Sequence, residues 1–307
     1  MSSAIRLMAA AVLPLVYLLL CAALAATVAY PVFLASGGDT VGSVRTLVSR
    51  GGQVFLILGL YPLSRWLGLT RVSLGLARTL PRQWAVGFLL GVSMLALHVM
   101  ALLALEIRAV NAGGFDWGRL LFVFGKSLGI GAIVALLEET IFRGALFAGV
   151  RRFSGPAAAV AISAFYYAAL HFLRSRMTLS HDAVGWDTGF RIAADGFAHL
   201  AAMPPDSFLA LLLAGVLLGC IRAAVPQGLG YCMGIHAGWV FVIKAAKSLT
   251  HGLPDARWSF LVGGYDGFIG YLAAAWMGLL ALSFAVAARN RARRAAPGAF
   301  DGNPARD

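Results

Sequence analysis

Long apolar runs, separated by short segments that hold arginine, glycine and proline, repeat along the chain almost to its end. Each of eight runs approaches the ~20 apolar residues that a helix needs to cross a bilayer. They lie at about 8–34, 53–69, 83–106, 119–149, 157–173, 207–225, 230–248 and 267–288. The pattern predicts an all-α fold, a multi-pass transmembrane helical bundle of about eight spans.

Composition agrees with a membrane environment. Of the 307 residues, 60% are hydrophobic and only 12% are charged, whereas soluble domains carry about 25% charged residues. Such a chain has too little polar surface to cover itself in water. We therefore expect the lipid bilayer to be its solvent.

The net charge of +12 comes from 25 basic against 13 acidic residues, and the basic residues form short clusters between apolar runs. Membrane proteins place basic clusters there, against anionic lipid, so we expect no nucleic-acid partner. Their distribution gives only a slight preference for both termini on the cytoplasmic side. The alanine-, glycine- and arginine-rich composition indicates a bacterial inner membrane protein.

The chain divides into four parts. Residues 1–118 form the N-terminal transmembrane helices, and residues 119–248 form a core that includes a long loop at 174–206. Residues 249–288 hold the last transmembrane helix, and residues 289–307 form a basic tail that we expect to be disordered.

The long loop carries an unusual number of polar side chains: His181, Asp182, Asp187, Asp195, His199 and Asp206. Within it, Gly189–Met203 can form a helix that lies on the membrane surface. The loop is either a solvated connector or a lid that gathers substrate. Loops of this length are uncommon without a role.

Two adjacent acids lie inside an apolar run. The chain has only three glutamates, Glu106, Glu138 and Glu139, and a carboxylate at mid-bilayer costs a few kcal/mol. Arg143 follows Glu139 by one helical turn, where an acid and a base can pair. An ion cluster that only holds helices together explains Glu139 and Arg143, but it leaves Glu138 without a role.

A histidine on the next span is a candidate partner for Glu138. Tyr167 and His171 are four residues apart and share one helix face. The turn between the two spans is expected at Ser154–Pro156, with 16 residues from Glu138 to Ser154 and 15 from Pro156 to His171. In an antiparallel hairpin both side chains therefore lie about 23 Å from the turn, at ~1.5 Å per residue.

Three of the six histidines, His98, His171 and His236, lie in predicted spans. His98 has no acidic neighbour in the sequence, and we expect it to bond a group within the bundle. His236 lies in the apolar seventh span, Gly234-Ile235-His236-Ala237-Gly238, and is a second candidate partner for the acids.

Together these segments form an ordered set of motifs. Glu-Glu-x-x-x-Arg, Phe-x-x-x-His with tyrosine in the aromatic place, and the histidine of His-x-x-x-Asn are met by Glu138, Glu139, Arg143, Tyr167, His171 and His236. In this order they resemble the CPBP family of intramembrane proteases, which are type II CAAX prenyl endopeptidases and their bacterial relatives, including bacteriocin-processing and self-immunity proteins. The resemblance covers about residues 119–248.

The resemblance implies an intramembrane endopeptidase that hydrolyses a membrane-associated protein or peptide. In that family's scheme Glu138 would be the general base for a water molecule, which His171 would hold. His236 would stabilise the oxyanion, and a donor aimed there contributes ~3 kcal/mol. Glu139 and Arg143 would pair and fix the helix geometry.

The sequence departs from the family motif at Val240, where asparagine would be a second oxyanion donor. Valine has no donor, which puts the catalytic rate in question. Lys244, two turns from His236, and the indole of Trp239 are alternative donors. Lys244 is equally explained as an anchor that reaches toward the membrane surface.

Two other hypotheses remain open. Glu138, His171 and His236 provide an oxygen and two nitrogens, a ligand set that binds zinc in several hydrolases, so the expected cofactor is none or zinc. The chain has no His-Glu-x-x-His motif, and the resemblance favours the metal-free mechanism. A non-enzymatic transporter, immunity or scaffold protein could also bury Glu138 with His171, although no repeated half of the kind found in transporters is visible.

Overall fold

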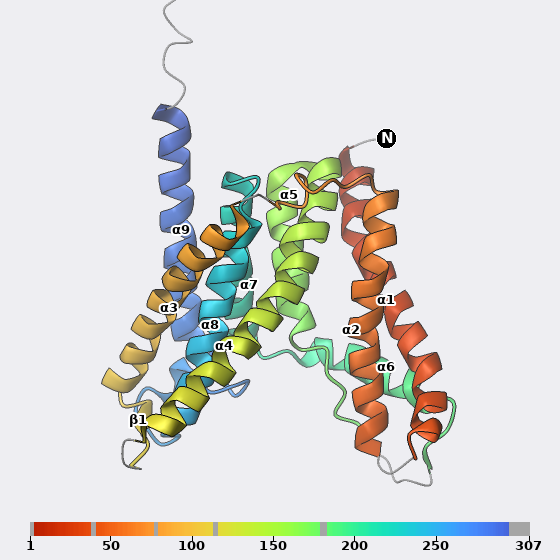
Figure 1. The fold of residues 1–307 in the computed structure, drawn as a ribbon, viewed down its shortest axis with the longest axis horizontal. Coiled ribbons are helices and arrows are strands. Elements are labelled where there is room, and N and C mark those ends of the chain that lie inside the picture. Colours follow the sequence, from red (N-terminus) through yellow and green to blue (C-terminus); the bar gives the residue numbers. More distant parts are fainter. Residues whose placement is uncertain (1–2, 38–40, 77–78, 113–115, 179–182, 295–307) are drawn as a thin grey trace, which may run out of the picture.

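The computed structural model describes residues 3–37, 41–76, 79–112, 116–178 and 183–294. Its long helices are α1 (Ser3–Ala35), α2 (Val41–Trp66), α3 (Leu80–Ala104), α4 (Trp117–Glu139), α5 (Phe147–Leu170), α7 (Pro205–Ala224), α8 (Leu229–Leu249) and α9 (Tyr271–Arg294). Most of them lie roughly along one common axis (Figure 1). The start of α1 and the end of α9 lie at the same end of the molecule (Figure 1). The predicted all-α bundle is confirmed.

Shorter elements connect these helices. A π-helix, η1 (Thr140–Leu146), joins α4 to α5, and α6 (Thr188–Ala198) continues into the 3-10 turn η3 (His199–Ala202). A second 3-10 turn, η4 (Ser259–Leu261), precedes α9. The strands β1 (Arg108–Val110) and β2 (Thr250–Gly252) pair antiparallel, with Ala109 opposite His251. The sequence pattern did not predict this small sheet.

Six helical runs in the described chain are long and apolar enough to cross a membrane: Ala4–Ala35, Leu80–Ala104, Trp117–Leu170, Pro205–Ala224, Leu229–Leu249 and Tyr271–Arg291. They support an integral membrane protein. The expected span at 53–69 overlaps α2, which begins earlier, at Val41, ends at Trp66 and is not among these runs. The run Trp117–Leu170 contains two of the expected spans.

Those two spans form a hairpin that turns at Gly155. Gly155 has φ 84° and ψ 176°, far from helical values, and Pro156 follows it. Positive φ favours glycine because it has no Cβ, and proline can begin the next helical segment. The predicted turn at Ser154–Pro156 is confirmed, and α5 descends beside the arm formed by α4 and η1 (Figure 1).

Helices α3 and α8 approach closely because glycines replace side chains at their contact. A Cβ on Gly91 would lie 2.2 Å from the Ile235 carbonyl oxygen, and a Cβ on Gly234 would lie 2.1 Å from that of Trp84. Small residues at this spacing allow helix backbones to meet in membranes. This contact fixes α8, the helix that carries His236.

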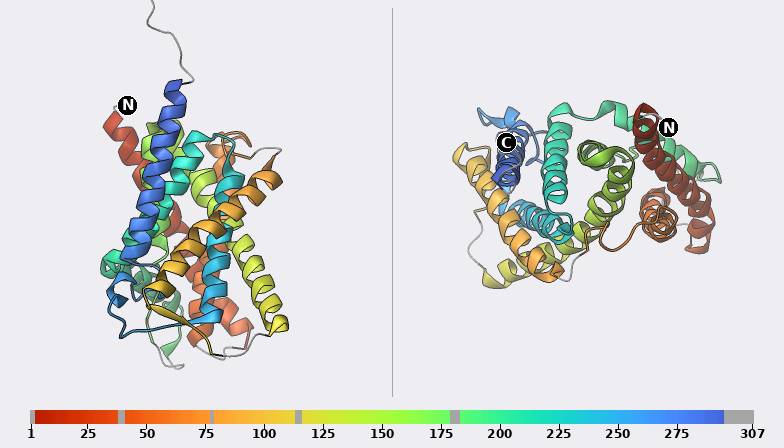
Figure 2. Two further views of the ribbon diagram at one scale, coloured as in Figure 1. Left: turned by 90° about the vertical axis from the view of Figure 1, so that its left-hand side faces the viewer. Right: turned by 90° about the horizontal axis from the view of Figure 1, so that it is seen from above.

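Helices α1 and α2 form an antiparallel pair at one side of the bundle (Figure 2). The pair packs on α5 and on α6, which crosses the lower end of the molecule (Figure 1). A Cβ on Gly189 of α6 would lie 2.4 Å from the Ala26 carbonyl oxygen of α1. This close contact ties the long loop to the first helix.

The ends of two predicted segments change. The helix expected at Gly189–Met203 is present as α6 and η3, and its position on the membrane surface stays a prediction, whereas His181 and Asp182 lie outside the described residues. The tail expected to be disordered from residue 289 begins as helix, since α9 continues to Arg294. Residues 295–307 lie outside the described part of the chain.

Candidate active site

The pair of Glu139 and Arg143 forms the base of the site. Arg143 lies in η1 and donates from Nη1 to Glu139 Oε1 over 2.9 Å, and both side chains are fully buried. Its Nη2 donates to the carbonyl oxygen of Gly215 on α7 over 3.2 Å. The pair therefore links α4 and η1 to α7. Each of the two buried charges has a partner, without which its burial would be costly.

His236 joins this pair from α8. Its Nδ1 lies 2.8 Å from Glu139 Oε1, and the side chain is 4% exposed. Because Glu139 pairs with Arg143 as an anion, it accepts a hydrogen bond, so Nδ1 carries the proton. The Nε2 of His236 then faces away from the pair. The sequence did not predict that Glu139 orients His236.

Glu138 lies between the two histidines at the end of α4. Its Oε2 is 3.9 Å from His171 Nε2 and 3.9 Å from His236 Nε2. Glu138 is 32% exposed, unlike Glu139, so its carboxylate reaches the cavity described below. The equal depth of Glu138 and His171 that the hairpin predicted is present.

The tautomers of the two histidines decide what this cluster binds. His171 Nδ1 lies 2.7 Å from the carbonyl oxygen of Tyr167, which only accepts, so Nδ1 donates. In their neutral forms both histidines thus present an unprotonated Nε2 toward Glu138. The buried Oε2 of Glu138 has no hydrogen-bond partner among the described residues. Three acceptors that converge in this way require a donor, such as a water molecule or a shared proton.

Tyr167 packs at the centre of the site. Its ring lies 4.6 Å from the His171 ring and 5.8 Å from the His236 ring, and the Arg143 guanidinium lies 4.3 Å from its centroid. Rings at these distances restrict the orientations of both imidazoles. Tyrosine therefore fills the place that phenylalanine takes in the family motif.

Arg222 is a buried residue near the site that sequence reasoning missed. It lies on α7 with 2% exposure, and its Nε donates to the carbonyl oxygen of Arg143 over 3.1 Å. Its two other nitrogens donate to the carbonyl oxygens of Pro226 and Ser73. Arg222 satisfies a backbone carbonyl of the π-helix, and an arginine inside an apolar run was the available signal.

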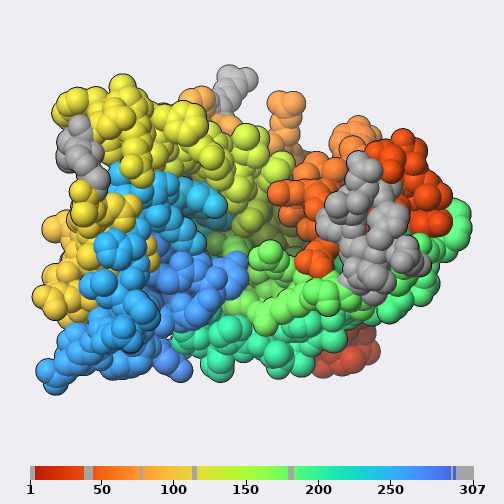
Figure 3. All heavy atoms as spheres, turned by 90° about the horizontal axis from the view of Figure 1, so that it is seen from below, coloured from red at the N-terminus to blue at the C-terminus, as the bar shows by residue number. Residues whose placement is uncertain are grey.

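A cavity of about 570 Å³ leads to Glu138 and His171. It is bounded by α1, α2, the hairpin and the long loop, and its lining includes Ile192, Ala193, Gly196 and Phe197 of the α6 segment. The lower face of the molecule is hollowed between α4 and α2 (Figure 3). The long loop thus contributes one wall of the cavity, and its role as a lid stays a prediction.

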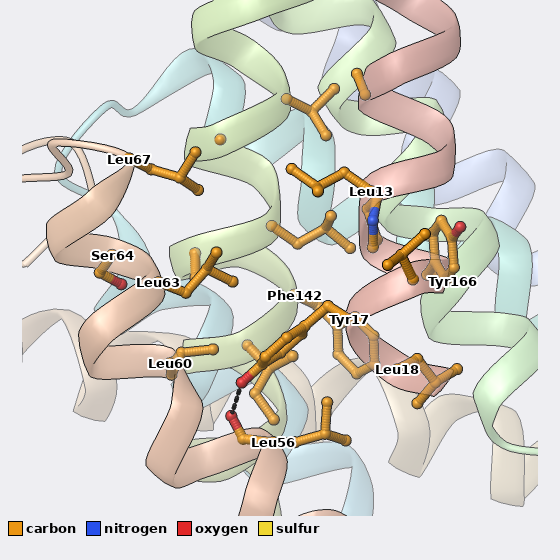
Figure 4. A pocket seen from close by; sticks show the side chains of 18 of the residues that line it. Leu13, Tyr17, Leu18, Leu56, Leu60, Leu63, Ser64, Leu67, Phe142 and Tyr166 are labelled. Atoms are coloured by element: carbon orange, nitrogen blue, oxygen red, sulfur yellow. Dashed lines mark hydrogen bonds between the residues drawn. The ribbon is translucent and has the colours of Figure 1, made fainter. Parts of the chain in front are cut away.

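A second cavity, of about 260 Å³ and lined almost wholly by apolar side chains, adjoins the first. Leucines of α2 face Leu13 and Leu18 of α1 across it, with Phe142 of η1 between them (Figure 4). Tyr17 bridges the two helices by donating to the Leu56 carbonyl oxygen over 2.7 Å. Both cavities share Leu18, Leu56, Ile141, Phe142 and Leu170 as lining residues, so they are contiguous.

The two alternative oxyanion donors have different surroundings. The indole Nε1 of Trp239 is buried without a partner among the described residues, and its ring lies 6.3 Å from that of His236. Lys244 is exposed, about 12 Å further along α8 at ~1.5 Å per residue. Trp239 is the nearer donor to the place of the missing asparagine, at Val240.

The zinc hypothesis finds no support in the geometry. No group of three His, Cys, Asp or Glu side chains in the described chain has an arrangement suited to a metal ion. The Nδ1 atoms of His236 and His171 are bonded to Glu139 and to the Tyr167 carbonyl oxygen, and each Nε2 lies 3.9 Å from Glu138 Oε2.

Predicted His98 contacts are also present, since its Nε2 lies 3.1 Å from the Phe268 carbonyl oxygen. His98 therefore joins α3 to the segment before α9, and this bond does not involve the acidic pair. It takes no part in the candidate site.

Comparison with known proteins identifies the central segment. Residues 120–242 match the family model described as type II CAAX prenyl endopeptidase Rce1-like. The matched segment contains α4 from Leu120 onward, the π-helix, α5, the long loop, α7 and most of α8. It includes every residue of the acid, arginine and histidine cluster. The resemblance inferred from the motifs is confirmed over this segment.

No curated protein and no solved structure matches the chain. Helices α1 to α3 and α9 lie outside the family match. The family match therefore gives no information about the cavity walls that α1 and α2 provide.

Proposed function

We propose that this protein is an intramembrane endopeptidase that hydrolyses a peptide bond with a water molecule activated by Glu138. The observation that carries the proposal is the convergence of Glu138 Oε2 with His171 Nε2 and His236 Nε2, at 3.9 Å each, beside a cavity. The match of residues 120–242 to a family described as endopeptidases supports the reaction class.

In the proposed reaction, Glu138 accepts a proton from water while the water oxygen attacks the peptide carbonyl carbon. His171 positions that water, because its Nδ1 is fixed by the Tyr167 carbonyl and its Nε2 is free to accept. The proton then passes from Glu138 to the amine that leaves when the carbon–nitrogen bond breaks. The products are a carboxylic acid and an amine, which together contain every atom of the peptide bond and the water, so no other reactant is required.

His236 would stabilise the oxyanion in its protonated form. Glu139 accepts from Nδ1 and orients the ring, so an Nε2–H of the protonated form can donate to the developing negative charge. Arg143 donates to Glu139 and holds its carboxylate in place. Trp239, with a buried indole N–H, is the donor that we assign to the role of the missing asparagine.

The substrate in this proposal is a membrane-associated protein or peptide. The contiguous apolar cavity between α1 and α2 suits an apolar segment that arrives from the bilayer. We place the protein in a bacterial inner membrane on the basis of its composition. The reaction in this proposal needs no cofactor, and inhibition by a chelator that added zinc reverses would refute that part.

The test compares membranes from cells that make the wild-type protein with membranes from cells that make Glu138→Gln at equal abundance. New protein termini are mapped by mass spectrometry, and termini that appear only with the wild type establish proteolysis. The matched control is Glu106→Gln, which changes a glutamate in the turn after α3, outside the cluster. If no termini differ, the hydrolase proposal fails. Loss of solute uptake in Glu138→Gln, with unchanged termini, would instead establish a transporter.

A further inference from the structure

The larger cavity has a basic wall that the catalytic proposal does not use. Arg45 and Arg50 of α2 and Arg174 after α5 line it, whereas Glu138 is the only acidic side chain among the described residues of its lining. Polar side chains of α2, Thr46, Ser49 and Gln53, lie along the same wall. The cavity thus combines a cationic wall with apolar surfaces from α1 and α6.

None of these three arginines forms an ion pair with another residue in the part of the chain that the structure describes. Arg45 donates from Nη2 to the Met177 carbonyl oxygen, and its buried Nε has no partner there. Arg50 bonds only the neutral amide of Gln53, over 3.1 Å. The wall therefore lacks a counter-charge among the described residues, and the buried Nε of Arg45 is costly to leave without a partner.

Asp195, an acid of the long loop, is already engaged. Asp195 of α6 accepts hydrogen bonds from the Ser175 hydroxyl at 2.7 Å and from the backbone N–H groups of Arg176 and Met177. His199 lies 3.5 Å from its other oxygen. Asp195 therefore serves the loop and is not a counter-ion for the arginines.

Two of the arginines, Arg45 and Arg50, lie along α2 to one side of the place where the two cavities meet. The two cavities meet at Leu56, and Arg50 and Arg45 precede it along α2 by about 9 Å and about 16 Å, at ~1.5 Å per residue. An extended peptide covers about 3.3 Å per residue. An extended peptide that lies along α2 past Leu56 would thus bring a group about three to five residues further along to the basic wall.

We propose that Arg45, Arg50 and Arg174 form a binding site for a carboxylate of the substrate peptide. The planar guanidinium fork binds a carboxylate through two hydrogen bonds, which are stronger than neutral ones. The carboxylate comes either from the peptide's C-terminus or from an aspartate or glutamate side chain. The role as a substrate site rests on the proposed endopeptidase function, and it assigns a specificity role to α2, outside the family match.

The test measures binding without turnover. Full-length Glu138→Gln protein in lipid nanodiscs is titrated with an N-dodecanoyl tetra-alanine peptide that has a free C-terminal carboxylate. A second probe is the same peptide with a C-terminal amide, and a third carries the amide and an aspartate in place of its third alanine. We expect at least one carboxylate probe to bind about tenfold or more tightly than the neutral amide, as a charged hydrogen bond contributes.

Arginine variants locate the site. In the Glu138→Gln background, Arg45→Gln, Arg50→Gln and Arg174→Gln should each reduce the preference for the carboxylate probe and leave binding of the neutral probe unchanged. Arg191→Gln is the matched control, because Arg191 lies on the same loop and outside the cavity lining. Arg50→Lys should keep part of the preference. Unfolding temperatures of all variants show that each is folded.

Each outcome decides a different point. A preference for the first probe alone assigns the site to a peptide terminus, and a preference for the third alone assigns it to an acidic side chain. Equal binding of all three probes, or equal losses in Arg191→Gln, overturns the site. Tighter binding of dodecyl phosphate than of either peptide carboxylate also overturns it, in favour of a lipid headgroup. A carboxylate preference without cleavage by the wild type would refute the endopeptidase and leave the anion site.

Discussion

Glu139 Oε1 lies 2.8 Å from His236 Nδ1, so the second acid of the pair orients the histidine that faces the first. The same oxygen accepts from Arg143. One buried carboxylate therefore positions two helices, α4 and α8, around Glu138. The adjacent glutamates have separate tasks, and their substitutions should have separate consequences.

Glu138→Gln should abolish cleavage without affecting folding. Amide nitrogen and oxygen keep the size of the side chain but cannot take the proton, so activity should fall by at least ~10²-fold. Because Glu138 is 32% exposed and has no hydrogen-bond partner at Oε2 among described residues, stability should change little. Activity on a mapped substrate and the unfolding temperature in detergent measure both effects. A strong loss of stability would contradict the assignment.

Glu139→Gln should act mainly on stability. The fully buried Arg143 would lose its anionic partner, and breaking such a pair by removing one member costs about 3–5 kcal/mol. The unfolding free energy of Glu139→Gln is compared with that of Glu138→Gln in the same detergent. Equal unfolding free energies of the two variants would contradict this prediction, because the Glu139–Arg143 pair would then contribute no more to stability than Glu138 does.

The α3–α8 contact should tolerate no added methyl group. In Gly91→Ala the Cβ would lie 2.2 Å from the Ile235 carbonyl oxygen, so the helices must separate. Overpacking of this kind costs ~1–3 kcal/mol, and the shift should also move His236 and lower activity. Gly129→Ala on α4 is the control, since nothing lies within 4 Å of its added Cβ. A similar unfolding temperature for both variants would contradict the contact.

Both ends of the described chain should lie on one side of the membrane, opposite the cavity mouth. The start of α1 and the end of α9 share one end of the molecule (Figure 1). A membrane-impermeant thiol reagent added to intact cells should label only one of the exposed positions in Asp255→Cys and Arg151→Cys. The wild type, with three native cysteines, provides the background. Labelling of both from one side would exclude this topology.

Acid should release the loop that Asp195 holds. The hydrogen bond from Ser175, followed by those from Arg176 and Met177 and the charge of His199, lowers the pKa of the Asp195 carboxyl below its usual 3.8. A lowered folded-state pKa means that the stabilisation is present above the unfolded pKa and is lost as pH falls through the folded one. Protection from hydrogen exchange at residues 175–177, relative to the intrinsic rate at the same pH, should therefore fall below about pH 4.

Asp195→Asn should show the faster exchange already at neutral pH. Asp187→Asn is the matched control, because Asp187 is 70% exposed and its oxygen lies 3.7 Å from Arg191. If the control loosened residues 175–177 as much as Asp195→Asn, the loss of the loop's hydrogen bonds would not be the cause.

Local spacing was sufficient for the part of the site that lies on one hairpin. The four-residue interval from Glu139 to Arg143 predicted their pair, and the residue counts on either side of Gly155 predicted that His171 would lie level with Glu138. These inferences depend only on helical rise and on one turn. They need no knowledge of how other helices pack.

Packing between distant helices was not predictable from those intervals. The bond from His236 to Glu139 depends on how α8 crosses α4, and the basic wall depends on where α2 lies. The glycines at Gly87, Gly91, Gly230, Gly234 and Gly238 were a visible signal for the α3–α8 contact. The partner of a small-residue face, however, is chosen by complementary shape, which a single sequence does not display.

The π-helix at Thr140–Leu146 makes the site sensitive to chain length as well as to chemistry. A π-helical turn corresponds to an extra residue accommodated within an α-helix. Because the wider turn absorbs that residue, deleting one residue between Glu139 and Arg143 would restore α-helical winding and leave the flanking helices nearly in register. A frame-preserving loss of a single codon there, with every catalytic side chain retained, would shorten the interval between Glu139 and Arg143 from four residues to three and so alter the pair that orients His236.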